Sequence, residues 1–222
     1  MTKKRDGQTE RPESATDPSR RRFLKGMGLA GAGAAIIDLL DPELAPAREG
    51  SSDADQRLIS DTVEVSLFVN GQRRTARVEP RTTLLTALRE YLDPPITGPK
   101  LVCDMGACGA CTVLLDDKPV YACLVLAVDA VGKRITTVEG LGTPEKMNAV
   151  QQAFVEKDAL MCGFCTPGFV TAISALLKRN PHPTLDEVRE ACQGNFCRCG
   201  TYPRVFEAAL AAAQMMDRER KA

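Results

Sequence analysis

The sequence predicts an α+β protein in which a small mixed β-sheet is followed by a four-helix domain. Up to residue 138, β-branched and apolar residues alternate in short runs separated by turn residues, which is typical of strands. Beyond Gly140-Leu141-Gly142 the apolar residues recur at helical spacing. Eight of the nine cysteines form two sets of four, one set in each half of this region. We therefore expect two domains, at residues 61–140 and 141–222, each built around one cysteine set.

The first 47 residues are predicted to be an export signal. The segment Ser19–Lys25 (S-R-R-R-F-L-K) is similar to the twin-arginine signature, and the apolar run Gly26–Leu40 behind it is too short to span a membrane. Ala45-Pro46-Ala47 fits a cleavage site. The alternative is a basic tail before a short buried helix, but the order of these features favours a signal. We therefore expect export to the periplasm in the folded state, with residues 48–60 as a flexible linker.

The sheet domain is predicted to begin with a hairpin and a helix. Residues 62–69 and 73–78 have the composition of strands, and Asn70-Gly71 between them is a strong signal for a type I′ turn. A helix is expected over residues 83–92, where leucines line one side. Asp93-Pro94-Pro95 should end that helix, because proline lacks the backbone N–H that a helix needs.

A cysteine loop and three further strands should complete the sheet domain. The loop runs from Cys103 to Cys111 and contains glycines that can adopt positive φ angles. Strands are expected over residues 111–115, 120–128 and 134–138, which places Cys123 on a strand.

Four helices are predicted for the second domain. The first should cover residues 144–155, with Thr143 as its N-cap and a proline in its first position. The second should run from near residue 167 to 178. Thr184–Glu187 is a capping box that should open the third, and an amphipathic pattern over 203–217 predicts the fourth.

Each cysteine set has the spacing of an iron–sulfur site. The first is C-x4-C-x2-C-x11-C, which begins with the plant-type ferredoxin run, and the second is C-x2-C-x31-C-x-C. Four thiolates are the usual ligands of a [2Fe–2S] cluster. The expected ligands are Cys103, Cys108, Cys111 and Cys123 in the first set, and Cys162, Cys165, Cys197 and Cys199 in the second. Two clusters in one small chain indicate an electron carrier, so we expect no catalytic residue here.

Structural zinc and disulfide bonds are the two alternatives for these cysteines. Structural zinc suits the second set loosely and the first set poorly, because zinc sites usually have two paired hooks of C-x2–4-C. Disulfides are disfavoured because nine is an odd number and the C-x-C loop is very short. Cys192 is left over, and burial as a small apolar residue is a better reading than substitution for a neighbouring ligand. Arg198, between two expected ligands, is either a solvated side chain or one that faces a partner and offsets cluster charge.

Composition excludes several other classes of function. Positive and negative side chains balance at 29 each, so no basic field would attract nucleic acid or a membrane surface. Aromatic residues make up only 5% and tryptophan is absent, which disfavours stacking on single-stranded nucleic acid. The single histidine, His182, lies in a predicted turn, so a histidine-based hydrolase or metal site is not expected.

Three stretches resemble the two-cluster [2Fe–2S] subunits of the molybdenum hydroxylases, the xanthine oxidase and aldehyde oxidoreductase family. They are residues 103–113 (CDMGACGACTV), 162–168 (CGFCTPG) and 194–202 (GNFCRCGTY). The similarity extends over about residues 62–215. It implies a β-grasp, plant-type ferredoxin-like domain followed by a helical [2Fe–2S]-binding domain.

The resemblance also implies a role and partners. A large subunit would bind a molybdopterin cofactor and oxidise an aldehyde or N-heterocycle, and electrons would pass through both clusters to an FAD-binding subunit or a c-type cytochrome. In relatives the last cysteine of the C-x-C pair, here Cys199, contacts the pterin. Relatives often have Gln where this chain has Met161, and Thr-Gly where it has Gly200-Thr201, so the pterin contact at Met161 differs. The alternatives are a free-standing exported two-cluster ferredoxin and a structural zinc protein.

Overall fold

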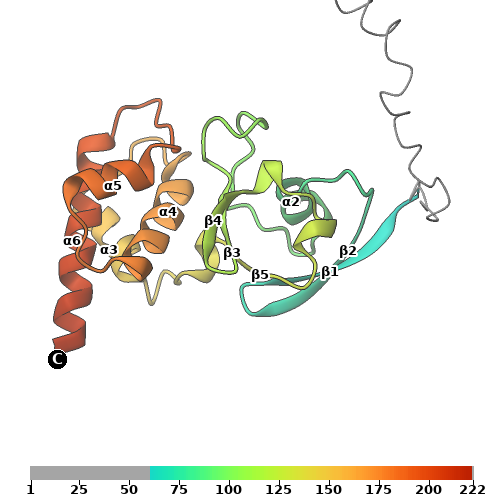
Figure 1. Ribbon diagram of the computed structural model, residues 1–222, viewed down its shortest axis with the longest axis horizontal. Coiled ribbons are helices and arrows are strands. Elements are labelled where there is room, and N and C mark those ends of the chain that lie inside the picture. Colours follow the sequence, from blue (N-terminus) through green and yellow to red (C-terminus); the bar gives the residue numbers. More distant parts are fainter. Residues whose placement is uncertain (1–60, 222) are drawn as a thin grey trace, which may run out of the picture. The chain divides into compact units, whose positions relative to one another are not determined.

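The computed structural model describes residues 61–221, so the predicted signal and linker lie outside the described residues. The chain first forms a five-stranded mixed sheet with strand order β2-β1-β5-β3-β4 (Figure 1). The strands are β1 (Val63–Val69), β2 (Gln72–Val78), β3 (Thr112–Leu115), β4 (Lys118–Tyr121) and β5 (Arg134–Thr136). β1 pairs parallel with β5, and the other neighbours are antiparallel.

Local turn chemistry sets the register of both hairpins. Asn70 and Gly71 have φ angles of 50° and 80°, as the predicted turn between β1 and β2 requires, and Val69 pairs with Gln72. Asp116 and Asp117 have positive φ in the same way between β3 and β4. Alternate residues of β1 are then buried on one face of the sheet.

A short helix covers this sheet. It is one α-helical turn, α2 (Leu84–Thr86), which continues as a wider π-type turn, η1 (Ala87–Tyr91). Thr83 caps its start, since the Thr83 hydroxyl accepts a hydrogen bond from the Thr86 N–H at 3.2 Å. Leu84, Leu85 and Leu88 are fully buried, so the predicted leucine side does face the core.

The prediction of a long strand through Cys123 is wrong. β4 ends at Tyr121, and Ala122–Leu124 form a single 3₁₀ turn, η2, that buries Ala122 and Cys123. Leu126 then makes an isolated bridge with Thr83 instead of continuing the β3–β4 ladder. The chain leaves the sheet there because it must pack under α2, where the backbone oxygen of Val125 accepts a bond from Leu84 N–H at 2.7 Å. Two more 3₁₀ turns, η3 (Val128–Ala130) and η4 (Val138–Gly140), flank β5.

Four helices follow, as predicted, although one begins later than expected. They are α3 (Ala149–Glu156), α4 (Thr166–Arg179), α5 (Leu185–Cys192) and α6 (Tyr202–Lys221). The expected start of the first helix at Thr143 is wrong, because Asn148 and Gln151 form a capping box five residues later. Thr143 instead closes a turn, in which its N–H and carbonyl both bond to Lys146. The predicted capping box at Thr184 is confirmed.

Two hydrophobic cores support the two halves. One lies between the sheet and α2, and the other lies among the four helices around Phe154, Phe169 and Ile173. α4 also packs against β3, and Lys178 Nζ lies 2.8 Å from Asp117 Oδ1. Residues 61–221 belong to one compact unit, and the domain boundary at residue 140 stays a prediction. No helix among residues 61–221 is long and apolar enough to cross a membrane.

Candidate functional site

The first cysteine set comes together as two pairs of thiols. Cys103 and Cys108, on the loop before β3, hydrogen-bond to each other and are half-buried. Cys111 and Cys123 are also hydrogen-bonded to each other and are buried, one at the start of β3 and one in η2. Burial is the main cause of the raised pKa of Cys111, and the nearby thiols of Cys123 and Cys108 add to it, so the two pairs are neighbours. The loop can fold this tightly because Gly106 and Gly109 have φ angles of 72° and 67°.

Backbone N–H groups point at the sulfurs of this loop. The N–H of Met105 donates to Cys103, and with further donors in the loop it lowers the pKa of that thiol to about 7 although burial opposes it. Burial raises the pKa of Cys111 to about 12. A buried thiol of this kind ionises when a bound cation supplies positive charge, which is what metal coordination does.

The second set also forms two pairs, each of which joins distant parts of the chain. The free thiol of Cys165, at the N-cap of α4, is a hydrogen-bonding neighbour of Cys197, and that of Cys162 is a hydrogen-bonding neighbour of Cys199. Cys165 and Cys197 are on the inner side, whereas Cys162 and Cys199 are exposed. The partial positive charge at the start of α4 does not prevail at Cys165, because burial, together with the hydrogen bond to Cys197, raises the pKa of its thiol to about 12.

Thr201 and Tyr202 hold Cys197 in place, a role the sequence did not reveal. The Thr201 hydroxyl lies 3.0 Å from the Cys197 sulfur, and the Tyr202 hydroxyl accepts a bond from the Cys197 N–H at 2.8 Å. Burial would raise the pKa of Cys197, but the bonds from Thr201, with those from Cys165 and Cys199, lower it to about 7. Phe169 packs edge-on against the Tyr202 ring. The signal in the sequence was that both residues lie within the motif at 194–202 (GNFCRCGTY), shortly after the C-x-C pair.

The arrangement in pairs fits a [2Fe–2S] cluster, which places its four thiolates on two irons. The N–H groups aimed at sulfur suit a cluster as well, since such bonds tune its potential. Both cysteine sets can thus hold a redox cluster.

The structure also places the other residues that the sequence singled out. Cys192 is buried in the helical core, and burial raises its pKa to about 12, so it is a poor thiolate. His182 is exposed, with its Nδ1 3.0 Å from Asp217 Oδ2. Arg198 and Met161 are exposed as well. Met161 lines a hollow of about 330 Å³ together with Gly200 and Thr201, so both departures from the family motif lie in one place.

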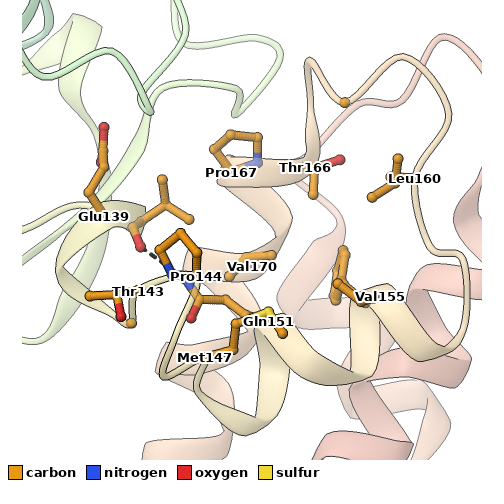
Figure 2. Close-up of a pocket in the computed structure, with 14 residues that line it drawn as sticks. Glu139, Thr143, Pro144, Met147, Gln151, Val155, Leu160, Thr166, Pro167 and Val170 are labelled. Atoms are coloured by element: carbon orange, nitrogen blue, oxygen red, sulfur yellow. Dashed lines mark hydrogen bonds between the residues drawn. The ribbon is translucent and has the colours of Figure 1, made fainter.

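An apolar groove adjoins the second cysteine set. Its volume is about 570 Å³, and Met147, Val155 and Leu160 line it beside Thr166 and Pro167 at the start of α4 (Figure 2). The groove reaches the cysteine loop because Gly163, between Cys162 and Cys165, is also part of its wall.

Two family profiles match the two halves of the chain. One, described as a 2Fe-2S iron-sulfur cluster binding domain, matches residues 67–132. The other, described as a [2Fe-2S] binding domain, matches residues 137–210. Each match contains one complete cysteine set.

Curated relatives and a solved structure match nearly the same region. The chain is 48% identical to the nicotine 6-hydroxylase small subunit of Paenarthrobacter nicotinovorans, over 69% of this chain and 91% of that one. It is 42% identical to the aldehyde oxidoreductase iron-sulfur-binding subunit PaoA of Escherichia coli K12, over 67% and 71%. The crystal structure of quinoline 2-oxidoreductase from Pseudomonas putida 86 superposes with a TM-score of 0.67 at 45% identity, over 72% of this chain and 98% of that chain. The predicted α+β fold is confirmed by this match.

Proposed function

Because the chain belongs to the family of two-cluster [2Fe–2S] small subunits of the molybdenum hydroxylases, we propose that it is the electron-transfer subunit of a periplasmic enzyme of this kind. The observation that carries the proposal is that each of the two [2Fe–2S] domain matches contains one complete set of four cysteines. When bound, the clusters supply one-electron carriers between a molybdenum centre and an electron acceptor. Substrate chemistry, on an aldehyde or an N-heterocycle, belongs to a partner subunit.

The eight cysteines are assigned as ligands, four to a cluster. Cys103, Cys108, Cys111 and Cys123 hold the first cluster, and Cys162, Cys165, Cys197 and Cys199 hold the second. Cys111, Cys123 and Cys197 are buried, and the backbone N–H donors near Cys103 orient and stabilise its sulfur.

A large molybdopterin-binding subunit is the proposed partner at the second set. Exposed apolar side chains surround Cys162 and Cys199, among them Met161, Phe164 and Phe196, which are 68%, 53% and 52% exposed. Exposed apolar side chains that lie together on a surface favour contact with another protein. The groove of Figure 2 continues this surface and suits an apolar segment of the same partner. Cys199 is the proposed contact to the pterin. At the position where relatives often have Gln, Met161 has a thioether in place of the side-chain amide, and a thioether cannot donate a hydrogen bond.

The first set is the proposed exit for electrons. Leu101, Val102, Met105 and Leu124 are exposed around its loop, which would suit docking of an FAD-binding subunit or a c-type cytochrome. A free-standing exported ferredoxin is the second candidate. Co-purification of tagged full-length chain from its native host separates the two, because a ferredoxin would come without a molybdenum-containing protein.

Metal analysis tests the cluster assignment. Anaerobically purified protein should contain about four iron and four sulfide per chain. Cys199→Ala should lower that content and weaken the spectrum of the second cluster, while the buried Cys192→Ala, as the matched control, should leave both spectra intact. Zinc in place of iron would contradict the proposal.

Export through the twin-arginine pathway is proposed from the Ser19–Lys25 segment. Arg20→Lys together with Arg21→Lys should leave the chain in the cytoplasm, as measured by cell fractionation. A matched pair, Lys3→Arg with Lys4→Arg, should export normally. Continued export of the Arg20, Arg21 variant would refute this part of the proposal.

A further inference from the structure

The two cysteine loops meet at a junction of three glycines from separate segments. Gly109 belongs to the first cysteine loop, Gly168 to the first turn of α4, and Gly194 to the loop before Cys197. A Cβ on Gly168 would strike the carbonyl oxygen of Gly109, and a Cβ on Gly109 would strike that of Gly194. The three backbones therefore approach more closely than any side chain would allow.

Asn195 ties this junction together from inside. Its side chain is buried, and Nδ2 donates to the Gly109 carbonyl at 2.9 Å, with Thr112 Oγ1 3.4 Å away. The Tyr121 hydroxyl donates to the Gly194 carbonyl at 3.0 Å, which ties the end of β4 to the same loop. Both bonds run from one half of the molecule to the other.

One backbone hydrogen bond connects the two cysteine sets directly. The N–H of Phe196 donates to the carbonyl of Cys108 at 2.9 Å. Cys108 belongs to the first set, and Phe196 is the residue before Cys197 of the second. A path between the two sets through this bond therefore crosses a single non-covalent contact.

We propose that Asn195 is a positioning residue that, with Gly109, Gly168 and Gly194, holds the two cysteine loops at the separation across which an electron passes through the Cys108–Phe196 contact. This inference rests on the proposed function. With both clusters bound, the step would be the transfer of one electron, in which one cluster is oxidised as the other is reduced and no covalent bond is made or broken. Because transfer between such sites weakens steeply with distance, the glycines set the rate by permitting close approach.

Two substitutions disturb the junction without touching a cysteine. Gly168→Ala inserts a methyl group against the Gly109 carbonyl, and since alanine favours a helix more than glycine does, α4 itself should not suffer. Asn195→Ala removes the bond to Gly109. The matched controls are Ser174→Ala on α4 and the exposed Gln193→Ala next to Gly194.

The spin–spin coupling between the clusters is the main readout, measured by electron paramagnetic resonance on fully reduced full-length protein. In Gly168→Ala and Asn195→Ala both clusters should be present. The splitting of their resonance signals by spin–spin coupling should narrow. After reduction by one electron in a pulse, the transfer of that electron between the clusters should be slower. The controls should match the wild type. Wild-type splitting and rate in both folded variants would overturn the inference. Should both variants lose a cluster, Tyr121→Phe is the milder test, with the same two outcomes.

Amide hydrogen exchange tests the junction independently of the metal. In Asn195→Ala the peptide that contains Phe196 should lose protection, while Gln193→Ala keeps it. Unchanged protection in Asn195→Ala would refute the positioning role. If the protein carried zinc but Asn195→Ala still lost exchange protection at Phe196, the proposed function would be refuted. The junction would then have only a structural role.

Discussion

At the scale of single residues, cysteines of the same set differ in burial and in the hydrogen-bond donors around their sulfur atoms. Cys197 is buried, yet it has a hydroxyl donor and several N–H groups around it, and the pKa of its thiol falls to about 7. Cys165, its hydrogen-bonded neighbour, has fewer donors, and burial raises its pKa to about 12. Hydrogen bonds to sulfur stabilise the electron-rich state, so they should also set the reduction potential of a bound cluster.

Thr201→Val is therefore expected to lower the reduction potential of the second cluster. The substitution removes the hydroxyl at 3.0 Å from the Cys197 sulfur and keeps the size of the side chain. Loss of a bond worth about 1 kcal/mol corresponds to ~40 mV for a one-electron couple. A potentiometric titration followed by electron paramagnetic resonance would measure it. Thr75→Val, exposed on β2, is the control, and an equal potential in the two variants would contradict the prediction.

At the scale of elements, capping decides where helices begin. α5 starts with a reciprocal cap, in which Thr184 Oγ1 accepts from the Glu187 N–H and the Glu187 carboxylate accepts from the Thr184 N–H at 2.7 Å. α3 has the same arrangement at Asn148, which displaced the expected start at Thr143. A threonine before a proline was a weaker signal than a complete capping box.

Thr184→Ala should destabilise the folded protein by about 1 kcal/mol, because N–H groups at the start of α5 lose their acceptor. Urea unfolding of the cluster-loaded protein, followed by circular dichroism, would show the change as a lower midpoint. Glu190→Ala, exposed near the other end of α5, should leave the midpoint nearly unchanged. A midpoint for Thr184→Ala that equals the wild-type value would mean that the cap contributes nothing.

At the scale of the whole molecule, two phenylalanines near the second cysteine set have opposite roles. Phe169 is fully buried in the helical core and packs on Tyr202, whereas Phe164 is 53% exposed beside Cys165. The ring of Phe164 lies 6.0 Å from Lys100 Nζ, so the exposed surface extends from the second cysteine set to the segment before the first. One aromatic ring holds the fold and the other is available to a partner.

Phe169→Ala should cost about 3–5 kcal/mol of stability, since it opens a cavity in the core. Phe164→Ala should leave the unfolding midpoint unchanged but weaken co-purification of a molybdenum-binding partner. Calorimetry and pull-down on the same pair of variants measure both effects. Equal losses of stability in the two would show that Phe164 supports the fold instead.

The sequence by itself determined the features that depend on neighbours along the chain. The Asn70-Gly71 turn and the Thr184 capping box need only local geometry, and both are confirmed, as is the α+β fold. Only the tertiary structure decided where Cys123 leaves the sheet, which thiols pair, and how Asn195 reaches Gly109. Asn195 and Gly109 are 86 positions apart in sequence, and no periodicity or spacing encodes a contact over that distance. Such contacts arise when the packing of two cores brings their loops together. A buried side-chain amide needs a hydrogen-bond partner, and that partner can lie far away in the sequence.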